Sequence, residues 1–560
     1  MSIWGCGSIS ASRIVSSLNL NHSETIPTMA RTTRENPPNT TISDVVASPW
    51  KATSRNPNSD YSDRSNQVWF WVWRYMRTVA VVLALLVLIM PISGCFGDEP
   101  VQSPEPEGPF STLGDIPETT WYHYSGGVNA LDPAAVSDAN ISDNLSGDNM
   151  PFLTVGSYYG IGMSTFEPTI GITSMDNIYM SSWGNGPSGS TAVIRCTGLI
   201  EMVSLTDYSC QNVYDPLLPV PNSNDPYIYV DKWTDRIMKF DMHALLGMTV
   251  EFSDDEGSTW QNGQLATSIY SVQDHQTIGS ALLPAPGYPT TWSFCVNGNA
   301  PHPLCSTSFD GGRTWTSEVS GAPVSCQSGG LTAHIEGGVN GNLYRGNIGC
   351  NGDGYSIYKS GNGGLTWTEH PLPTEETGTA DTWNGEEAQV AVDDEGNVHA
   401  MWNGLDNMPY YSYSNDEGGT WSAPMMVAPP TNISGTGFPV ITAGAAGKVA
   451  LGYVGDSGND TWNGYMTIIT DAFGENPLMT TVQLNGFDDP LDTEVGCGYN
   501  RCGGLGDFLD MSVDQYGRPW FGLSHNINDV GIFGTITQGP SLRGMIDGLS
   551  EIPVGGPQTL

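Results

Sequence analysis

The sequence predicts an all-β protein, a single β-propeller of four-stranded blades, with seven blades expected and six as the alternative. An eight-residue motif recurs every 52 to 55 residues along much of the chain, and repeats of this length are typical of propellers and solenoids. The 560 residues include 68 glycines, 38 prolines, 17 tryptophans and 23 tyrosines. This composition favours short strands joined by tight turns.

The recurring motif has the pattern Ser-x-Asp-x-Gly-x-Thr-Trp, and one copy carries Asn362 at the aspartate position. Glycine permits the positive φ of a tight turn, the carboxylate accepts backbone N–H groups, and tryptophan packs on the sheet. We therefore expect a structural role for the motif, including Arg313 inside one copy. The four copies are Ser253–Trp260, Ser308–Trp315, Ser360–Trp367 and Ser414–Trp421.

Seven segments have the pattern of a strand, a turn and a second strand, and each is expected to form the inner half of a blade. Ring closure is expected to pair an N-terminal strand, Thr120–Tyr124 or Phe152–Tyr158, with the last blade, because closure removes exposed edges. The seven segments are residues 167–183, 225–240, a segment that starts near 276, 332–348, 388–402, 438–454 and 508–523.

The motif resembles the Asp boxes, or BNR repeats, of the sialidase superfamily, and the resemblance covers about residues 150–545. That superfamily includes exo-sialidases, other glycoside hydrolases, and binding proteins without catalysis. The resemblance implies a propeller whose Asp-box turns lie on the face opposite the ligand site. The functional face would then be built by the loops that lead into each innermost strand.

Polar residues precede most of the presumed inner strands, and together they would form a ring of carboxylates and histidines at the channel mouth. Such a ring is suited to binding a cation, binding sugar hydroxyls, or acid–base catalysis. The alternative is that these residues bond to the backbone of the next blade. The polar residues are Glu167, Asp225, Asp274, His275, Gln276, His334, Glu336, Glu386, Glu387 and Asp507. The predicted catalytic residues are Asp274, His275, Glu387 and Asp507, and the predicted substrate-binding residues are Arg345, Arg501, Trp292 and Trp383.

A true exo-sialidase is doubtful on this sequence. The resemblance implies three arginines for the substrate carboxylate, the first of them in an Arg-Ile-Pro type motif, and that motif is absent. Only seven arginines follow residue 95. Arg236 and Arg518 fall in inner hairpin turns, which places them on the opposite face. No cofactor is expected; calcium binding at the polar ring, or at the aspartate-rich segment 132–148, is an open alternative.

The charge of the chain separates two regions and excludes one class of partner. Residues 96–560 carry 11 Lys+Arg against 54 Asp+Glu, whereas residues 1–95 carry 8 against 5. Nucleic acid is therefore excluded as a partner, because phosphate binding needs lysine and arginine.

The cysteines beyond residue 95 form four close sequential pairs, which predicts four disulfides in an oxidising compartment. Metal binding is the alternative, although no zinc-type spacing accompanies the cysteines. The expected pairs are Cys196–Cys210, Cys295–Cys305, Cys326–Cys350 and Cys497–Cys502.

The N-terminal region predicts export and anchoring. The apolar run Thr78–Ile92 follows Arg74 and Arg77 and leads to Ile92-Ser93-Gly94-Cys95. This order is typical of a secretory signal, and its end resembles a lipobox in which Cys95 is lipidated; an uncleaved membrane anchor is the alternative. The expected organisation is 1–75 as a non-native or disordered extension before a start at Met76, 76–95 as the signal, 96–150 as an acidic, proline-rich linker, 151–545 as the propeller, and 546–560 as a tail.

Taken together, these features predict a monomeric lipoprotein on the exterior of a prokaryotic cell, attached to the membrane through its lipid. Its expected partner is an extracellular glycan or glycoprotein. Two functions are open: a sialidase-like propeller that binds or processes glycans, with glycoside hydrolysis as its chemistry, and a non-catalytic binding or adhesion propeller.

Overall fold

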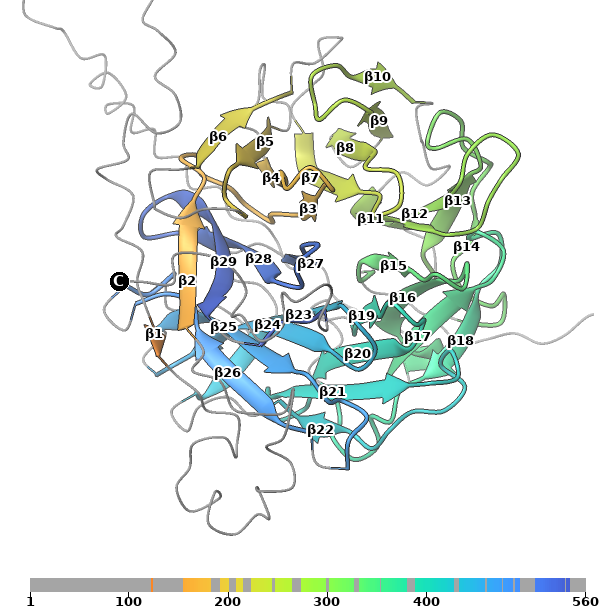
Figure 1. Ribbon diagram of the computed structural model, residues 1–560. Coiled ribbons are helices and arrows are strands. Elements are labelled where there is room, and N and C mark those ends of the chain that lie inside the picture. The colour runs from red at the N-terminus through yellow and green to blue at the C-terminus, as the bar shows by residue number, and fades with distance from the viewer. Residues whose placement is uncertain are drawn as a thin grey trace, which may run out of the picture. The chain divides into compact units, whose positions relative to one another are not determined.

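A computed structural model shows a ring of seven antiparallel β-sheets around a central axis (Figure 1). It describes residues 122–123 and 155–543, except for 183–191, 201–207, 215–222, 244–246, 264–272, 299–301, 327–331, 353, 380–387, 428–432, 459–460, 476, 487–488, 494–508 and 539. Within this part of the chain no helix is long and apolar enough to cross a membrane. The prediction of seven four-stranded blades is confirmed, and the six-bladed alternative is wrong.

Each blade follows the chain from its innermost to its outermost strand, and we number the blades in chain order. Blade 1 contains β3 (Ile170–Ile172), β4 (Ile178–Ser182), β5 (Ala192–Thr197) and β6 (Ser209–Asn212). Blade 2 contains β7 (Ser223–Val230), β8 (Ile237–His243), β9 (Gly247–Ser253) and β10 (Gln261–Asn262). Blade 3 contains β11 (Gln273–Ala281), β12 (Thr291–Gly298), β13 (Leu304–Ser308) and β14 (Val319–Ser320).

The remaining blades repeat this order. Blade 4 contains β15 (Ile335–Gly337), β16 (Leu343–Ile348), β17 (Tyr355–Ser360) and β18 (Thr368–Pro371), with a 3-10 turn, η3 (Cys350–Gly352), between β16 and β17. Blade 5 contains β19 (Gln389–Val392), β20 (Val398–Asn403), β21 (Pro409–Ser414) and β22 (Met425–Met426). Blade 6 contains β23 (Gly435–Ala443), β24 (Val449–Asp456), β25 (Trp462–Ile469) and β26 (Met479–Gln483).

Blade 7 closes the ring with a strand from the beginning of the propeller. Its three strands β27 (Asp510–Val513), β28 (Pro519–His525) and β29 (Val530–Gln538) are followed in the sheet by β2 (Val155–Gly160) and then β1 (Tyr122–His123). Both N-terminal candidates predicted for closure therefore take part in it. Each innermost strand contacts the innermost strand of the next blade, and β27 contacts β3.

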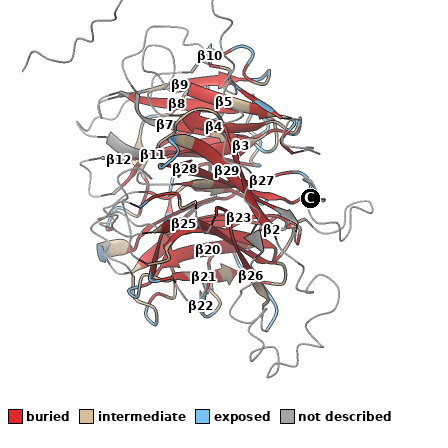
Figure 2. Cartoon of the chain, turned by 90° about the vertical axis from the view of Figure 1, so that its left-hand side faces the viewer, coloured by how far each residue is buried: buried red, intermediate tan, exposed pale blue. Residues whose placement is uncertain are grey.

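The core lies between the faces of successive blades, as expected when sheets pack on one another. Figure 2 shows buried residues along most strands, and β25 is buried at all of its positions. Between blades 2 and 3, Phe240 stacks on Phe294 with ring centroids 5.0 Å apart. Because both faces of the sheets are covered, strands such as β16, β20 and β28 are buried along their whole length rather than at alternate residues.

The four motif copies form the same hydrogen-bonded turn. In the first copy, Ser253 Oγ accepts the N–H of Gly257 at 2.9 Å, and the Asp255 carboxylate accepts the N–H of Thr259 at 2.8 Å. In the third copy in chain order, Asn362 Oδ1 accepts the N–H of Thr366 at 3.0 Å, so an amide oxygen replaces the carboxylate. The turn is thus stabilised by local bonds that its own residues supply.

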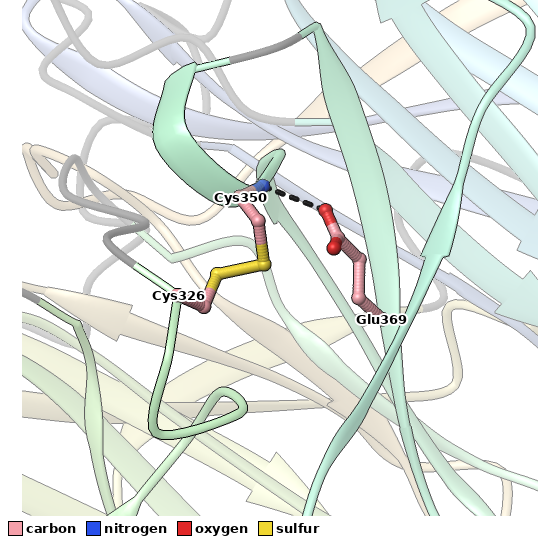
Figure 3. A group of neighbouring side chains, drawn as sticks. All are labelled: Cys326, Cys350 and Glu369. Atoms are coloured by element: carbon pink, nitrogen blue, oxygen red, sulfur yellow. Dashed lines mark hydrogen bonds between the residues drawn. A yellow bond between two sulfur atoms is a disulfide. The ribbon is translucent and has the colours of Figure 1, made fainter.

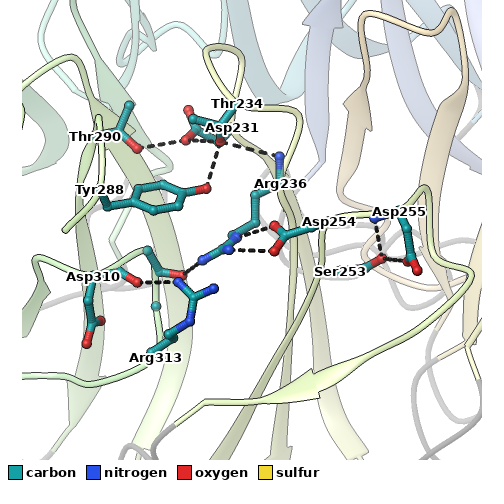
Figure 4. A network of polar contacts seen from close by, with 12 residues as sticks. Asp231, Thr234, Arg236, Ser253, Asp254, Asp255, Tyr288, Thr290, Asp310 and Arg313 are labelled. Carbon is teal, nitrogen blue, oxygen red and sulfur yellow. Dashed lines mark hydrogen bonds and ion pairs between the residues drawn. The ribbon is translucent and has the colours of Figure 1, made fainter.

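Motif turns also contact the inner hairpin turn of the preceding blade, so both lie on one face of the ring. Arg236, in the inner turn of blade 2, binds Asp254 through Nε and Nη2 at 2.6 Å each, and its Nη1 donates to the Gly311 carbonyl of blade 3 (Figure 4). The guanidinium lies 4.5 Å from the centroid of the Tyr288 ring. The guanidinium of Arg236 therefore joins blades 2 and 3. This structural role is consistent with the prediction that Arg236 lies away from the ligand face.

Three of the four predicted disulfides are present. Cys196–Cys210 joins β5 to β6, Cys295–Cys305 joins β12 to β13, and Cys326–Cys350 joins the segment after β14 to the η3 turn between β16 and β17. The fourth predicted pair, Cys497 and Cys502, lies outside the described residues, as does Cys95.

Candidate functional site

Five side chains from three blades approach one another across the axis of the propeller. We call them the axial cluster: Tyr227 and Tyr229 on β7, His334 and Glu336 at the start of β15, and Asp510 on β27. These strands belong to blades 2, 4 and 7, which are not neighbours in the ring (Figure 1). Inner strands of non-adjacent blades can meet only across the axis, so these contacts place the cluster at the axis of the ring.

His334 connects the three blades by hydrogen bonds. Its Nε2 lies 2.9 Å from the carbonyl oxygen of Leu509, and its Nδ1 contacts the hydroxyl of Tyr227. A carbonyl oxygen can only accept, so Nε2 carries the proton and Nδ1 of the neutral ring accepts from Tyr227. His334 therefore spans the channel from blade 4 to blades 2 and 7.

Polar residues at the beginning of other inner strands bind the backbone of the next blade. Asp510 Oδ2 accepts the N–H of Ile170 at 2.9 Å, and Thr169 Oγ1 accepts the N–H of Ile228 at 2.7 Å. Thr277 Oγ1 does the same for Ile335 at 2.8 Å. Such bonds to the next blade are the structural alternative considered for the polar ring, but Asp510, Thr169 and Thr277 are not members of the predicted ring. Burial raises the pKa of Asp510, although the electrostatic influence of His334 and the two backbone N–H groups that the Asp510 carboxylate accepts act against this rise.

Glu336 differs from these residues, because its carboxyl group has no hydrogen bond or ion pair within the described part of the chain. The side chain is half-buried on β15. Burial raises its pKa to about 7, Lys232 opposes the rise, and Asp510 adds to it. The carboxyl group can therefore hold or release a proton near neutral pH, which is the property of a general acid.

Replacing Glu336 by glutamine is expected to change how stability depends on pH. Because the folded-state pKa of about 7 lies above the ordinary 4.5, the folded state holds this proton more tightly than the unfolded state. The free energy of unfolding should therefore fall as pH rises from about 4.5 to about 7. Above this window Glu336→Gln should be more stable than the wild type by up to about 3 kcal/mol, and the two should be equal below pH 4.5. Denaturant titrations at pH 4 and pH 8 measure this difference; an equal difference at both pH values would contradict the assigned pKa.

The predicted catalytic residues lie at the edge of what the structure describes or beyond it. Asp274 and His275 are on β11, where Asp274 pairs with Asn297 ahead of a bulge that ends at Thr277. The backbone there is described, but the side chains are not. Residues Glu387, Asp507, Arg501 and Trp383 lie outside the described residues. Their assignments remain predictions.

The predicted substrate-binding roles of Trp292 and Arg345 need correction. Both side chains have 0% exposed surface. Trp292 packs edge-on against Tyr229, and Arg345 donates to the carbonyl of Gly321 at 2.6 Å. Residues on β12 and β16, the second strands of their blades, face the neighbouring blade rather than the channel. Burial lowers the pKa of Arg345 to about 10, so its cation is enclosed in the core and cannot reach a ligand.

Cys326, Cys350 and Glu369 bring two sulfur atoms and a carboxylate together, an arrangement that could hold a metal (Figure 3). The two sulfurs are bonded to each other, and Glu369 Oε1 accepts the N–H of Cys350 at 2.6 Å and the hydroxyl of Ser356 at 2.9 Å. Thiolates bind metals only when reduced. In the oxidised protein this group is a disulfide whose loop is held by a carboxylate.

His334 and Glu336 were among the polar residues that precede the inner strands in sequence, but neither was in the predicted catalytic set. The signal that could have separated them is their spacing, because residues two apart on a strand face the same side. Residues 334 and 336 therefore direct a histidine and a carboxylate to the channel together.

No protein-family model matches the chain, and no curated protein matches it. Among solved structures, the chain is similar to a mutant of the NanB sialidase from Streptococcus pneumoniae at 9% identity, covering 68% of this chain and 92% of that one with a TM-score of 0.37. A polysaccharide lyase described as an ulvan lyase gives 11% identity, 69% and 96% coverage, and a TM-score of 0.39. The six-bladed lectin of Aleuria aurantia is 11% identical, with 56% of this chain and 96% of that chain covered and a TM-score of 0.36.

Proposed function

We propose that this protein is a propeller anchored at the cell surface through Cys95, that it binds extracellular glycans at the axial cluster, and that it hydrolyses them with Glu336 as general acid. One observation carries the proposal: Glu336 is a half-buried carboxyl group with no partner among the described residues and a pKa raised to about 7.

Glycoside hydrolysis requires a group that donates a proton to the glycosidic oxygen as the bond to the sugar breaks. A carboxyl group that is still partly protonated at neutral pH meets this requirement. The phenols of Tyr227 and Tyr229 interact electrostatically with Glu336, and burial raises their pKa values, so both stay neutral at the pH at which Glu336 exchanges its proton. The second carboxylate of such a mechanism would come from Asp274, Glu387 or Asp507.

A non-catalytic binding propeller is the second candidate, and one observation favours it. Asp510, the other carboxylate of the axial cluster, accepts two backbone N–H groups, from Ile170 at 2.9 Å and Met511 at 2.8 Å. Within the described residues Glu336 is thus left as the one unengaged carboxyl of the cluster, whereas the usual hydrolytic mechanism needs two.

Exo-sialidase chemistry has no support among the described arginines. Each of them contacts groups within the blades: Arg195 the Glu256 carbonyl, Arg236 Asp254, Arg313 the Asp310 carbonyl, Arg345 the Gly321 carbonyl, Arg518 Asp514 and Arg543 Asp394. Among the described residues, a carboxylated sugar would therefore find no arginine clamp of the kind that such a ligand needs.

Glycan-array binding and hydrolysis of fluorogenic glycosides by the full chain test the proposal. Glu336→Gln should retain glycan binding and lose hydrolysis by about 100-fold or more, the usual contribution of a general acid. Glu395→Gln, in an exposed turn of blade 5, is the matched control and should act as the wild type does. Binding without any turnover by the wild type would select the second candidate. Wild-type protein that neither binds nor cleaves any glycan would overturn both.

A further inference from the structure

Blade 2 contains three charged side chains inside its packed core, which we call the blade 2 charge cluster: Lys239, Asp241 and Glu251. Lys239 and Asp241 are two residues apart on β8, and Glu251 is the cross-strand partner of Lys239 on β9. The exposed fractions of the three side chains are 1%, 0% and 5%. The axial cluster uses none of them, so they need a separate explanation.

The three groups are in mutual contact and are shielded by an aromatic ring. Lys239 Nζ contacts Asp241 Oδ2, lies 3.5 Å from Glu251 Oε2, and lies 3.8 Å from the centroid of the Tyr214 ring. The hydroxyl of Tyr214 donates to the same Glu251 oxygen. The amine of Lys239 is therefore held between two carboxyl groups, away from water.

Burial makes the fully ionised form of this cluster costly. Each ion buried in a core loses several kcal/mol of hydration free energy, and conversion of an ion pair to an amide removes two such ions. Transfer of a proton from Lys239 to a carboxylate gives a neutral amine beside a neutral carboxylic acid. A desolvated lysine is a nucleophile when neutral, and contact with the acid gives the two groups a very high effective concentration.

We propose that Lys239 and Asp241 condense to form an intramolecular isopeptide bond, with Glu251 as the proton carrier. Nζ attacks Cγ of the protonated Asp241 carboxyl, the Nζ–Cγ bond forms, and the bond from Cγ to the hydroxyl oxygen breaks. Glu251 accepts a proton from the amine and passes it to the departing hydroxyl, which leaves as water. The reaction consumes no oxidant, reductant or cofactor, and its product is one amide and one water molecule.

The positions of the residues permit this bond and stabilise its product. Residues two apart on a strand face the same side and are separated by roughly 6.6 Å, a gap that the four methylenes of lysine span. The amide N–H would donate to Glu251 in place of the ammonium, and the Tyr214 hydroxyl would continue to donate to the same carboxylate. An amide also replaces two of the three buried charges, and water expelled from the core cannot readily reverse the reaction.

Mass spectrometry of the purified full-length protein tests the proposal. The peptide that contains Lys239 and Asp241 should be lighter by one water, and trypsin should not cleave after Lys239. Dehydration of the aspartate alone, as a cyclic imide, would also remove one water but would leave Lys239 cleavable, so the two readings together identify the isopeptide. A peptide of full mass with cleavage at Lys239 would overturn the proposal and identify the cluster as purely ionic.

Two variants test the assigned roles. Asp241→Asn should give a cross-linked peptide of the same mass as the wild type, because the amide forms with loss of ammonia instead of water. Glu251→Gln keeps the size of the side chain but cannot accept the proton, and its cross-linked fraction should fall at least tenfold. A fully cross-linked Glu251→Gln protein would show that Glu251 is not the proton carrier. The measurement on the wild type decides whether the bond exists even where a variant fails to fold.

Discussion

Replacing Gly346 by alanine is expected to separate blades 4 and 5 and to destabilise the protein by about 3 kcal/mol or more. Gly346 lies on β16, and a Cβ built there would be 1.5 Å from the carbonyl oxygen of Ala388 and 2.6 Å from its carbonyl carbon. Those atoms are backbone immediately before β19, the innermost strand of blade 5. Backbone cannot rotate away as a side chain can, so relief requires the blades to move apart.

Chemical denaturation of Gly346→Ala beside Gly287→Ala measures this effect. Gly287 lies in the turn between β11 and β12, and a Cβ built there meets no atom within 4 Å. The control should unfold within about 0.5 kcal/mol of the wild type, the range of an ordinary surface substitution. An unchanged midpoint for Gly346→Ala would mean that the two blades are farther apart than described here.

Removing residues 1–160 is expected to abolish cooperative folding, because this deletion takes away the strand that closes the ring. β2 pairs with β29 from Val155 to Gly160, and Tyr158 on β2 is 1% exposed within the core cluster of blades 6 and 7. Without β2, the whole of β29 becomes an unpaired edge beside uncovered apolar side chains. Such edges pair with other chains and cause aggregation.

A deletion of residues 1–120, which retains β1 and β2, is the matched control. The control should remain monodisperse in size-exclusion chromatography and melt in one transition, whereas the 1–160 deletion should aggregate or melt over a broad range. A monomeric 1–160 deletion with the wild-type melting curve would show that the three-stranded remainder of blade 7 is sufficient, and that closure contributes little.

The architecture was accessible from the sequence because its signals are local. The hydrogen bonds of the Ser253–Trp260 turn and of its copies join residues within a segment of eight. Inner hairpins such as 388–402 can be recognised in the sequence by two apolar runs on either side of a turn. The three described disulfides close separations of only 10 to 24 residues. Short-range bonds of this kind depend on the order of residues alone, so the seven blades could be predicted from them.

The candidate site could be predicted only in part from the sequence. Trp292, Arg345 and Glu336 show why. An aromatic ring and an arginine near polar loops suggest a ligand surface, but the register of β12 and β16 turns both into the core. Glu336 and Asp510 both precede or begin inner strands, yet Asp510 is bound by backbone N–H groups and Glu336 is not. Sequence position identified Glu336 as one of a set of polar residues but did not identify Asp510, and the neighbouring blade decides which of the two carboxyl groups remains available.

By itself, the sequence determined the propeller, its seven expected blades and the structural nature of the repeated turns, since periodicity and turn chemistry are properties of the chain. That nucleic acid is not a partner stays a prediction from the net charge. Only the tertiary structure decided which groups meet at the axis. His334 bonds to Tyr227, 107 residues away, and to Leu509, 175 residues away. Contacts at such separations arise when the ring closes and brings blades 2, 4 and 7 around one channel, and the burial that raises the pKa of Glu336 exists only after that closure.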